Sequence, residues 1–233
     1  SDANHRQMFL SVGCALENLL IAADYYGWPV EVEFFPEPTE RFFVARLMFK
    51  DVHYLADQVD HFPHLFFAIP ERRMNRNPYE AKPVPEGFIK KVKELETGDT
   101  KVFFIQNGGE KAKVIEIVAK AVEAAFSDRE VREELRRWMR PNARKHRDGL
   151  LGYTMGMSYF ASLFSSFALR RYRGMLLGQS LERTPVFVMI ATETDDPADW
   201  VRVGQKYERI ALMAQAAGLS TGVFASPIQI DNF

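Results

Sequence analysis

A short cluster of basic and amide side chains has the residue types and spacing that bind phosphate. Arg72, Arg73, Asn75 and Arg76 lie within five consecutive residues. If this stretch forms a helical turn, Arg72 and Arg76 lie four residues apart on one face. Two guanidinium groups on one face can hold a phosphate through bidentate hydrogen bonds. A solvated basic linker is the alternative, and the residue types alone leave both interpretations open.

The composition predicts a folded chain and argues against several classes of function. The 233 residues are 47% hydrophobic and 26% charged, enough to form one large or two small domains. Lysine and arginine number 30 against 31 acidic residues, which argues against nucleic-acid binding. We find no run of eighteen apolar residues and no signal-peptide pattern, so we expect no membrane span. A single cysteine excludes an intrachain disulfide. We therefore expect a cytoplasmic protein.

Two other groups of side chains could do chemistry but have simpler interpretations. His61 and His64 could face one metal ion from a helix, with Asp57 or Asp60 as the nearest further ligand. A pair of surface histidines is the favoured interpretation, and we predict no metal site. Cys14 lies on the apolar face of a predicted helix with no histidine nearby, which favours a small buried hydrophobic residue over a nucleophile.

The hydrophobic pattern predicts a mixture of helices and strands. Apolar residues at helical spacing predict helices, whereas alternating or short continuous apolar runs predict strands. Glycine and proline mark several of the ends. Helices are expected at 11–26, 51–62, 86–95, 110–126, 128–139 and 197–217, and strands at 30–35, 42–49, 101–106 and 185–191. The last strand is continuously apolar and is predicted to be covered on both faces. Residues 155–169 are apolar nearly all round and should be buried or lie at an interface.

The chain contains a weak internal repeat. Residues 12–36 align without a gap with residues 203–227, and both copies predict a helix, a glycine stop and an extended exit. We interpret them as two copies of one helix–strand unit, and two unrelated helices capped by glycine are the alternative. The identical pairs are Val12/Val203, Gly13/Gly204, Glu17/Glu208, Ala23/Ala214, Gly27/Gly218, Val32/Val223 and Pro36/Pro227.

The basic cluster resembles the N-terminal phosphate motif of the nitroreductase-like flavoprotein superfamily. That motif begins R-R-S-x-R and continues to P-V-P before a helix. Arg72, Arg73 and Arg76 match its basic positions, and Met74 stands where serine is usual. The resemblance implies that the three arginines, together with Asn75, contact the phosphate of FMN.

The C-terminal end of the chain resembles the same superfamily. Residues 206–221 are similar to its penultimate helix, which ends in A-x-x-L-G-L-G/D-S/T, and the exit at 221–226 would approach the isoalloxazine. Asp148-Gly149 and the segment 13–35 resemble the tandem-repeat branch of the superfamily. The residues that this resemblance assigns to cofactor binding here are Gly218, Leu219, Ser220, Thr221, Ala225 and Ser226.

The resemblance implies an α+β fold in which helices wrap a central, mainly antiparallel sheet. Residues 1–68 would form a degenerate half-repeat and residues 69–233 the more complete FMN-binding repeat. In this superfamily the flavin lies between two copies of the fold, usually in a dimer. We therefore expect either a homodimer or an intrachain pseudo-dimer, with residues 155–169 buried between the two repeats or across the dimer.

The implied function is that of an FMN-binding oxidoreductase of the nitroreductase type. The flavin N5 would take hydride from NADH or NADPH and pass electrons to a nitroaromatic, a quinone or a similar acceptor. Because the cofactor does the redox chemistry, no acid–base residue is required and none is assigned. A flavin-sequestering or flavin-storage protein without turnover is one alternative. A structural module that has lost the cofactor site is another.

Overall fold

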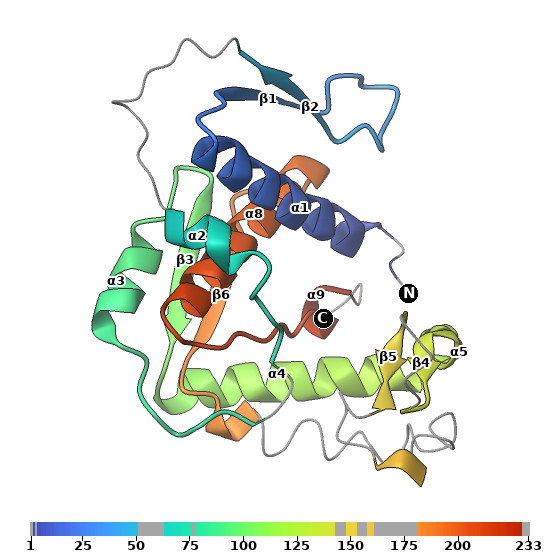
Figure 1. Ribbon diagram of the computed structural model, residues 1–233. Coiled ribbons are helices and arrows are strands. Elements are labelled where there is room, and N and C mark those ends of the chain that lie inside the picture. The colour runs from blue at the N-terminus through green and yellow to red at the C-terminus, as the bar shows by residue number, and fades with distance from the viewer. Residues whose placement is uncertain are drawn as a thin grey trace.

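The computed structural model describes residues 2, 4–50, 63–75, 78–142, 148–152, 158–160 and 181–229. Its centre is a pair of 20-residue helices, α1 (Arg6–Tyr25) and α8 (Pro197–Ala216), which cross one another (Figure 1). Around this pair lie the helices α2 (Pro63–Ala68), α3 (Glu86–Lys93), α4 (Gly108–Ser127), α5 (Arg129–Trp138) and α9 (Ser226–Gln229). The strands are β1 (Val30–Phe34), β2 (Ala45–Phe49), β3 (Thr100–Ile105), β4 (Met139–Arg140), β5 (Leu150–Leu151) and β6 (Phe187–Thr192).

The helices α1 and α8 are structural equivalents over their whole length. They begin and end at positions separated by the same offset that relates the two sequence copies. Gly27 and Gly218 follow them with φ angles of 69° and 71°, which glycine adopts without steric cost. In each copy, the residue after the glycine donates its N–H back to the helix. These two hydrogen bonds, both 2.8 Å, run from Trp28 to the Ala23 carbonyl and from Leu219 to the Ala214 carbonyl.

The two helices touch through a reciprocal glycine contact. A Cβ atom on Gly13 would lie 2.1 Å from the Val201 carbonyl oxygen, and a Cβ on Gly204 would lie 2.1 Å from the Leu10 carbonyl oxygen. The contacts are mutual and occur at repeat-related positions, so a pseudo-two-fold axis passes between the helices. Only glycine allows the backbones to approach this closely.

The chain leaves the two helices in different ways. After α1, strand β1 pairs antiparallel with β2, from Val30 opposite Phe49 to Phe34 opposite Ala45. After α8, Thr221 makes an isolated bridge and helix α9 then begins. The repeat is therefore confirmed for the helix and its glycine stop, whereas the exits differ. The predicted division into segments 1–68 and 69–233 stays a prediction.

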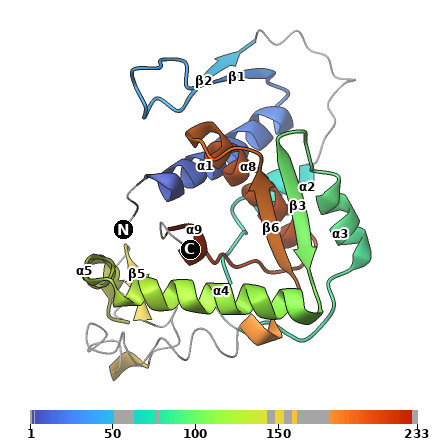
Figure 2. The same ribbon diagram turned by 180° about the vertical axis from the view of Figure 1, so that it is seen from behind.

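The hairpin β1–β2 covers α1, whereas the antiparallel pair β3–β6 lies beside α8 (Figure 2). Val92 of α3, Val102 of β3 and Ile210 of α8 form a core on the inner face of β3–β6. The outer face leaves Phe103 45% and Met189 49% exposed. Phe187 lies on the same face as Met189 but packs against Val118 of α4. Among the described residues, this face is therefore covered only at one end of β6, and the prediction that the 185–191 strand is covered on both faces holds only in part.

The mixture of helices and antiparallel strands is compatible with the predicted α+β class. Among the described residues, however, the strands form three separate two-stranded sheets, and β4–β5 is parallel. The expected single central sheet is thus not found there, because the crossed pair α1–α8 occupies the centre and separates the hairpin β1–β2 from β3–β6 (Figure 1).

Most predicted elements within the described residues are confirmed. The helices at 86–95, 110–126, 128–139 and 197–217 end within two residues of their predicted bounds. Asp128 caps α5 by accepting hydrogen bonds from the N–H groups of Glu130 and Val131. The strand predicted at 42–49 begins three residues late, because Phe43 donates its N–H to Glu40 in a turn.

Two predicted segments lie largely outside the described residues. The helix expected at 51–62 is one of them. Only residues 158–160 of the apolar segment 155–169 are described, and there the Tyr159 and Phe160 side chains are 52% and 77% exposed in the isolated chain. The expected burial between the two repeats does not hold for these two side chains.

Among the described helices, α1 alone is long and apolar enough to cross a membrane by length and composition. The sequence analysis did not expect such a helix. This is weak evidence for a membrane span, because the core helix of a soluble protein and a signal sequence meet the same criteria. In this structure α1 packs directly on α8.

Candidate functional site

The two segments predicted to bind the cofactor lie side by side. Met74 forms a parallel bridge with Thr221, and the Asn75 N–H donates a 2.7 Å hydrogen bond to the Thr221 carbonyl. In Figure 1 the chain leaving α2 passes the chain leaving α8. The fold thus joins the basic cluster to the exit of the second repeat helix, although they are far apart in sequence.

This junction is close-packed around Gly222. A Cβ atom on Gly222 would lie 2.7 Å from the Tyr79 hydroxyl oxygen and 2.8 Å from the Asn75 carbonyl oxygen. Burial raises the pKa of the Tyr79 hydroxyl, and a hydrogen bond with the Asn75 side chain opposes that shift. The sequence analysis assigned no role to Gly222 or Tyr79, since no local pattern shows that the two residues meet.

The backbone of the basic cluster is not helical where it is described. The Arg72 N–H donates to the Ala68 carbonyl at 2.8 Å and completes the end of α2. From there to Asn75 the chain runs without helical hydrogen bonds, because Asn75 donates across to Thr221. The prediction that Arg72 and Arg76 share a helix face is therefore wrong at Arg72. Arg76 itself lies outside the described residues.

Arg72 is tied to the core by a buried ion pair. Its Nε atom lies 2.8 Å from Oε1 of Glu208, a carboxylate on α8 that is only 1% exposed. The Arg72 side chain is 28% exposed, so part of it reaches the surface. Glu208 was not among the site residues predicted from the sequence. A signal was present in the sequence: Glu208 aligns with Glu17 in the two repeat copies, and both acidic residues stand within a mostly apolar helix face.

Arg73 and the residues after α8 take other positions. The exposed Arg73 guanidinium donates from Nη1 to the Pro70 carbonyl at 2.7 Å and to the Arg72 carbonyl at 2.9 Å. Gly218 and Ser220 are exposed, whereas Leu219 is half-buried. The remaining predicted contacts are also half-buried; they are Thr221, Ala225 and Ser226.

The two repeat helices each bury one carboxylate at the same position. Glu17 on α1 is 4% exposed and pairs with the Arg209 guanidinium, while the Gln205 side chain donates to it at 3.3 Å. Glu208 pairs instead with Arg72, which comes from outside the helix pair. The pseudo-symmetry of the helices therefore does not extend to the partners of their carboxylates.

Cys14 and Tyr207 lie close to this charged group. Burial raises the pKa of the Cys14 thiol to about 11, and the nearby Glu208 carboxylate adds to the shift. Its Sγ donates to the Gly204 carbonyl at 3.3 Å. Burial also raises the pKa of the Tyr207 hydroxyl. Both groups are thus neutral near pH 7, and Cys14 is a packing residue rather than a nucleophile.

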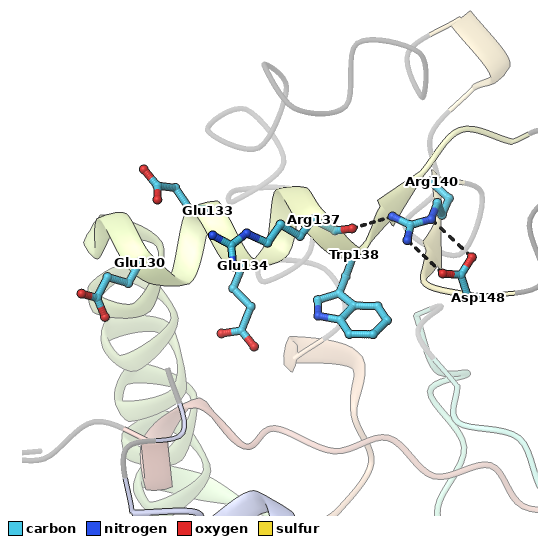
Figure 3. A pocket seen from close by; sticks show the side chains of 7 residues that line it. All are labelled: Glu130, Glu133, Glu134, Arg137, Trp138, Arg140 and Asp148. Atoms are coloured by element: carbon cyan, nitrogen blue, oxygen red, sulfur yellow. Dashed lines mark hydrogen bonds and ion pairs between the residues drawn. The ribbon is translucent and has the colours of Figure 1, made fainter.

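A separate surface hollow of about 720 Å³ lies along α5 (Figure 3). Arg140 lies at one end of it in this view, with Nη2 2.9 Å from Oδ2 of Asp148, and the Trp138 side chain is 52% exposed. The hollow is lined by Glu130, Glu133, Glu134, Arg137, Trp138, Arg140 and Asp148. None of the predicted cofactor residues that the structure describes lines it, so it is distinct from the junction at Thr221.

The described residues contain no group of three or more histidine, cysteine, aspartate or glutamate side chains that could hold a metal ion. Of the pair considered in the sequence analysis, His64 belongs to α2 and His61 lies outside the described residues.

Comparison with known proteins finds distant relatives along nearly the whole chain. No family model matches the chain. Two proteins of Mycobacterium tuberculosis, from strains CDC 1551 and H37Rv, are each named “Putative NAD(P)H nitroreductase” and are 28% identical to this chain over 239 residues. The alignments cover 99% of this chain and 65% of each relative. An “Uncharacterized protein” of strain H37Rv is 23% identical over 225 residues, which cover 95% of this chain and 63% of that protein. The chain thus spans slightly under two thirds of the relatives' length.

These similarities support a nitroreductase-like family for the chain. They extend along nearly its whole length, as the resemblance in the sequence analysis does. The names of the first two relatives describe those proteins as oxidoreductases of the nitroreductase type with NAD(P)H as electron donor.

Proposed function

We propose that the chain is an FMN-binding oxidoreductase of the nitroreductase type, which moves electrons from NADH or NADPH to nitroaromatics, quinones or similar acceptors. The observation that carries this proposal is the contact between residues 72–75 and Thr221. The resemblance assigns the first segment to the FMN phosphate and the exit of α8 to the isoalloxazine. Two segments that bind one cofactor must lie close together, and these two do.

The residues at the junction fit a phosphate group through Arg72. A guanidinium has five N–H donors, and the ion pair with Glu208 engages Nε. The four N–H groups on the terminal nitrogens are suited to a phosphate, and the side chain is partly exposed. Arg73 and Asn75 would add charge and an amide donor, and Arg76 is proposed as a further phosphate ligand.

The exit of α8 would form the ring side of the site. We propose main-chain contacts from the segment after Gly218, with Leu219, Ser220, Thr221, Ala225 and Ser226 as its members. The Thr221 carbonyl already accepts from Asn75, so its role is to hold the two segments together. Gly222 keeps the junction closed, because any larger residue would meet Tyr79.

When bound, FMN supplies the hydride and electron transfer of the proposed reaction. The chain would bind its phosphate, orient its ring and leave room for the second substrate. We assign no acid–base residue. The name of the two relatives supports NADH or NADPH as the donor, and the acceptor class follows from the proposed nitroreductase type.

The assembly we propose has the flavin between two copies of the fold. The mutual contact of α1 and α8 supports an intrachain pseudo-dimer, formed by segments 1–68 and 69–233 in the tandem-repeat branch. The exposed Phe160 and the outer face of β3–β6 favour a homodimer. We propose a cytoplasmic location for this assembly.

The test is an FMN titration of the purified chain, with riboflavin as the ligand that lacks phosphate. We expect flavin absorption near 450 nm and tighter binding of FMN than of riboflavin. The Arg72→Lys variant keeps a charge beside Glu208 but loses the planar fork, so it should bind FMN about 10- to 100-fold more weakly and riboflavin unchanged. Equal affinity of the parent for FMN and riboflavin contradicts the phosphate assignment.

Anaerobic mixing with NADPH and with NADH then separates the enzyme from the alternatives. Rapid bleaching of the flavin supports the proposed oxidoreductase. A yellow chain that does not bleach is the flavin-storage protein, and a chain that binds no flavin is the structural module.

A further inference from the structure

We propose that Glu208 is a positioning residue that fixes the Arg72 guanidinium for phosphate binding. This inference rests on the proposed function, since it concerns the same FMN phosphate. Glu208 lies on α8 and would not touch the cofactor, so its effect would pass through Arg72. The ion-pair distance of 2.8 Å from Nε to Oε1 is the direct observation.

The site of contact on the guanidinium matters. A carboxylate 2.8 Å from Nε holds the inner edge of the group by charge and leaves the terminal nitrogens for another acceptor. Because Glu208 is 1% exposed and belongs to a 20-residue helix, its own position is fixed by the core. Arg72 thus has a rigid inner anchor and a partly exposed outer end.

Stability alone does not explain this carboxylate. Within the described part of the chain, neither carboxylate oxygen of Glu208 has a well-aligned hydrogen bond, so the Arg72 contact alone balances its charge. A buried ion pair of this kind stabilises a fold no better than well-packed apolar residues. The neighbours of Glu208 along α8 include Ile210, Ala211 and Leu212, which are all buried and apolar.

Two effects of removing the Glu208 charge oppose each other. A neutral side chain would make the site more positive, which by charge alone should tighten phosphate binding. It would also release Arg72 from its anchor, and binding would then have to order a long side chain. We expect the second effect to dominate, because Arg72 reaches the surface, where solvent screens the charge.

The chain supplies a matched control in Glu17. It occupies the same repeat position on α1, is buried to a similar degree and pairs with Arg209. Glu17→Gln therefore removes an equivalent buried carboxylate without disturbing Arg72. If both carboxylates only stabilise the fold, Glu17→Gln and Glu208→Gln should change the binding of FMN and riboflavin in the same way.

The experiment measures the dissociation constants of FMN and riboflavin for the parent chain, Glu208→Gln and Glu17→Gln, with thermal unfolding as a check on folding. We expect Glu208→Gln to weaken FMN about 10- to 30-fold with riboflavin unchanged, and Glu17→Gln to leave the ratio of the two constants at the parent value. In an Arg72→Lys background, Glu208→Gln should add little, because the two residues act as one unit.

The outcomes separate the inference from the function on which it rests. If the parent prefers FMN but Glu208→Gln binds it as tightly or more tightly, positioning is wrong and the proposed function stands. If both glutamine variants weaken FMN and riboflavin alike, the carboxylates are structural and positioning is again wrong. If the parent shows no preference for FMN, the proposed function fails and the inference fails with it. If Glu208→Gln does not fold, Glu208→Asp takes its place, because it keeps the charge but shortens the side chain by one methylene. The ratio of the FMN and riboflavin dissociation constants is then compared with that of the parent in the same way.

Discussion

At the scale of single residues, the described arginines of the basic cluster have different partners and are not equivalent. Arg72 pairs with a buried carboxylate, whereas Arg73 bonds to the main chain of its own segment. Removing one or the other therefore tests different things. A change at Arg72 acts on the core as well as on the proposed phosphate site, and a change at Arg73 acts on the surface.

We predict that Arg72→Ala lowers the free energy of unfolding by about 2–3 kcal/mol, because Glu208 is left buried without its partner. Arg73→Ala should change it by less than about 0.5 kcal/mol, since its side chain is exposed. Urea denaturation of the two variants measures the difference. The double variant Arg72→Ala/Glu208→Gln should recover part of the loss. Equal stability of the two single variants contradicts the importance of the buried pair.

A second prediction at this scale concerns the Cys14 thiol. With a pKa of about 11, raised from 9.0 mainly by burial, the thiol stays protonated at pH 8. Modification by a thiol reagent should be at least about tenfold slower in the folded chain than in urea. Because the unfolded thiol loses its proton first, this residue's contribution to stability falls as the pH rises from about 9 to about 11. Reagent kinetics at pH 8 test the first statement, and fast labelling of the folded chain would overturn it.

At the scale of elements, the crossing of α1 and α8 organises the fold. Their reciprocal glycine contact brings backbone against backbone, and the rest of the chain is arranged around the pair (Figures 1 and 2). Glu17 and Glu208, which are both buried, lie on the same helices about one turn after Gly13 and Gly204.

Gly13→Ala and Gly204→Ala should each lower the free energy of unfolding by about 2–3 kcal/mol, because the added methyl group overlaps a carbonyl oxygen of the facing helix. Gly87→Ala on α3 is the matched control. Its Cβ would meet nothing within 4 Å, so alanine should be neutral or stabilise by up to about 1 kcal/mol. Thermal or urea unfolding gives the comparison, and a stable Gly204→Ala variant would contradict the close crossing.

At the scale of the whole molecule, the two copies of the repeat helix have different surroundings. The chain leaves α1 into the hairpin β1–β2 and leaves α8 into the junction with the basic cluster. Glu17, the buried carboxylate on α1, forms an ion pair with Arg209 within the helix pair. Glu208, the buried carboxylate on α8, forms an ion pair with Arg72 from outside it. In the described residues, only the second half combines a basic segment with a helix exit.

We therefore predict one FMN per chain, a consequence of the proposed function. The ratio of flavin absorbance to protein concentration after removal of free cofactor measures it. A value near one is expected in a monomer and in a dimer alike, because each chain would contribute one complete phosphate site. A value near two would mean that the first half binds flavin as well, and that its carboxylate serves a ligand.

Local chemistry in the sequence determined the elements of this protein. Apolar spacing and the two glycine stops at Gly27 and Gly218 predicted the repeat helices, because both signals act within a few residues. Alternation at 30–35 and the apolar run at 42–49 predicted the strands of the hairpin to within three residues for the same reason. The resemblance to a flavoprotein motif pointed to the basic cluster and the exit of α8, which the structure brings into contact; their shared cofactor site stays a prediction.

Only the tertiary structure decided how those elements meet. The helical turn expected from Arg72 onward is not formed between Arg72 and Asn75, because Thr221 offers Asn75 a hydrogen-bond acceptor that no local pattern shows. The exposed face of β6 and the pairing of Arg72 with Glu208 likewise depend on what packs against each element. Spacing along a chain predicts the face of a helix or strand, but the partner of a side chain is set by contacts between residues distant in sequence.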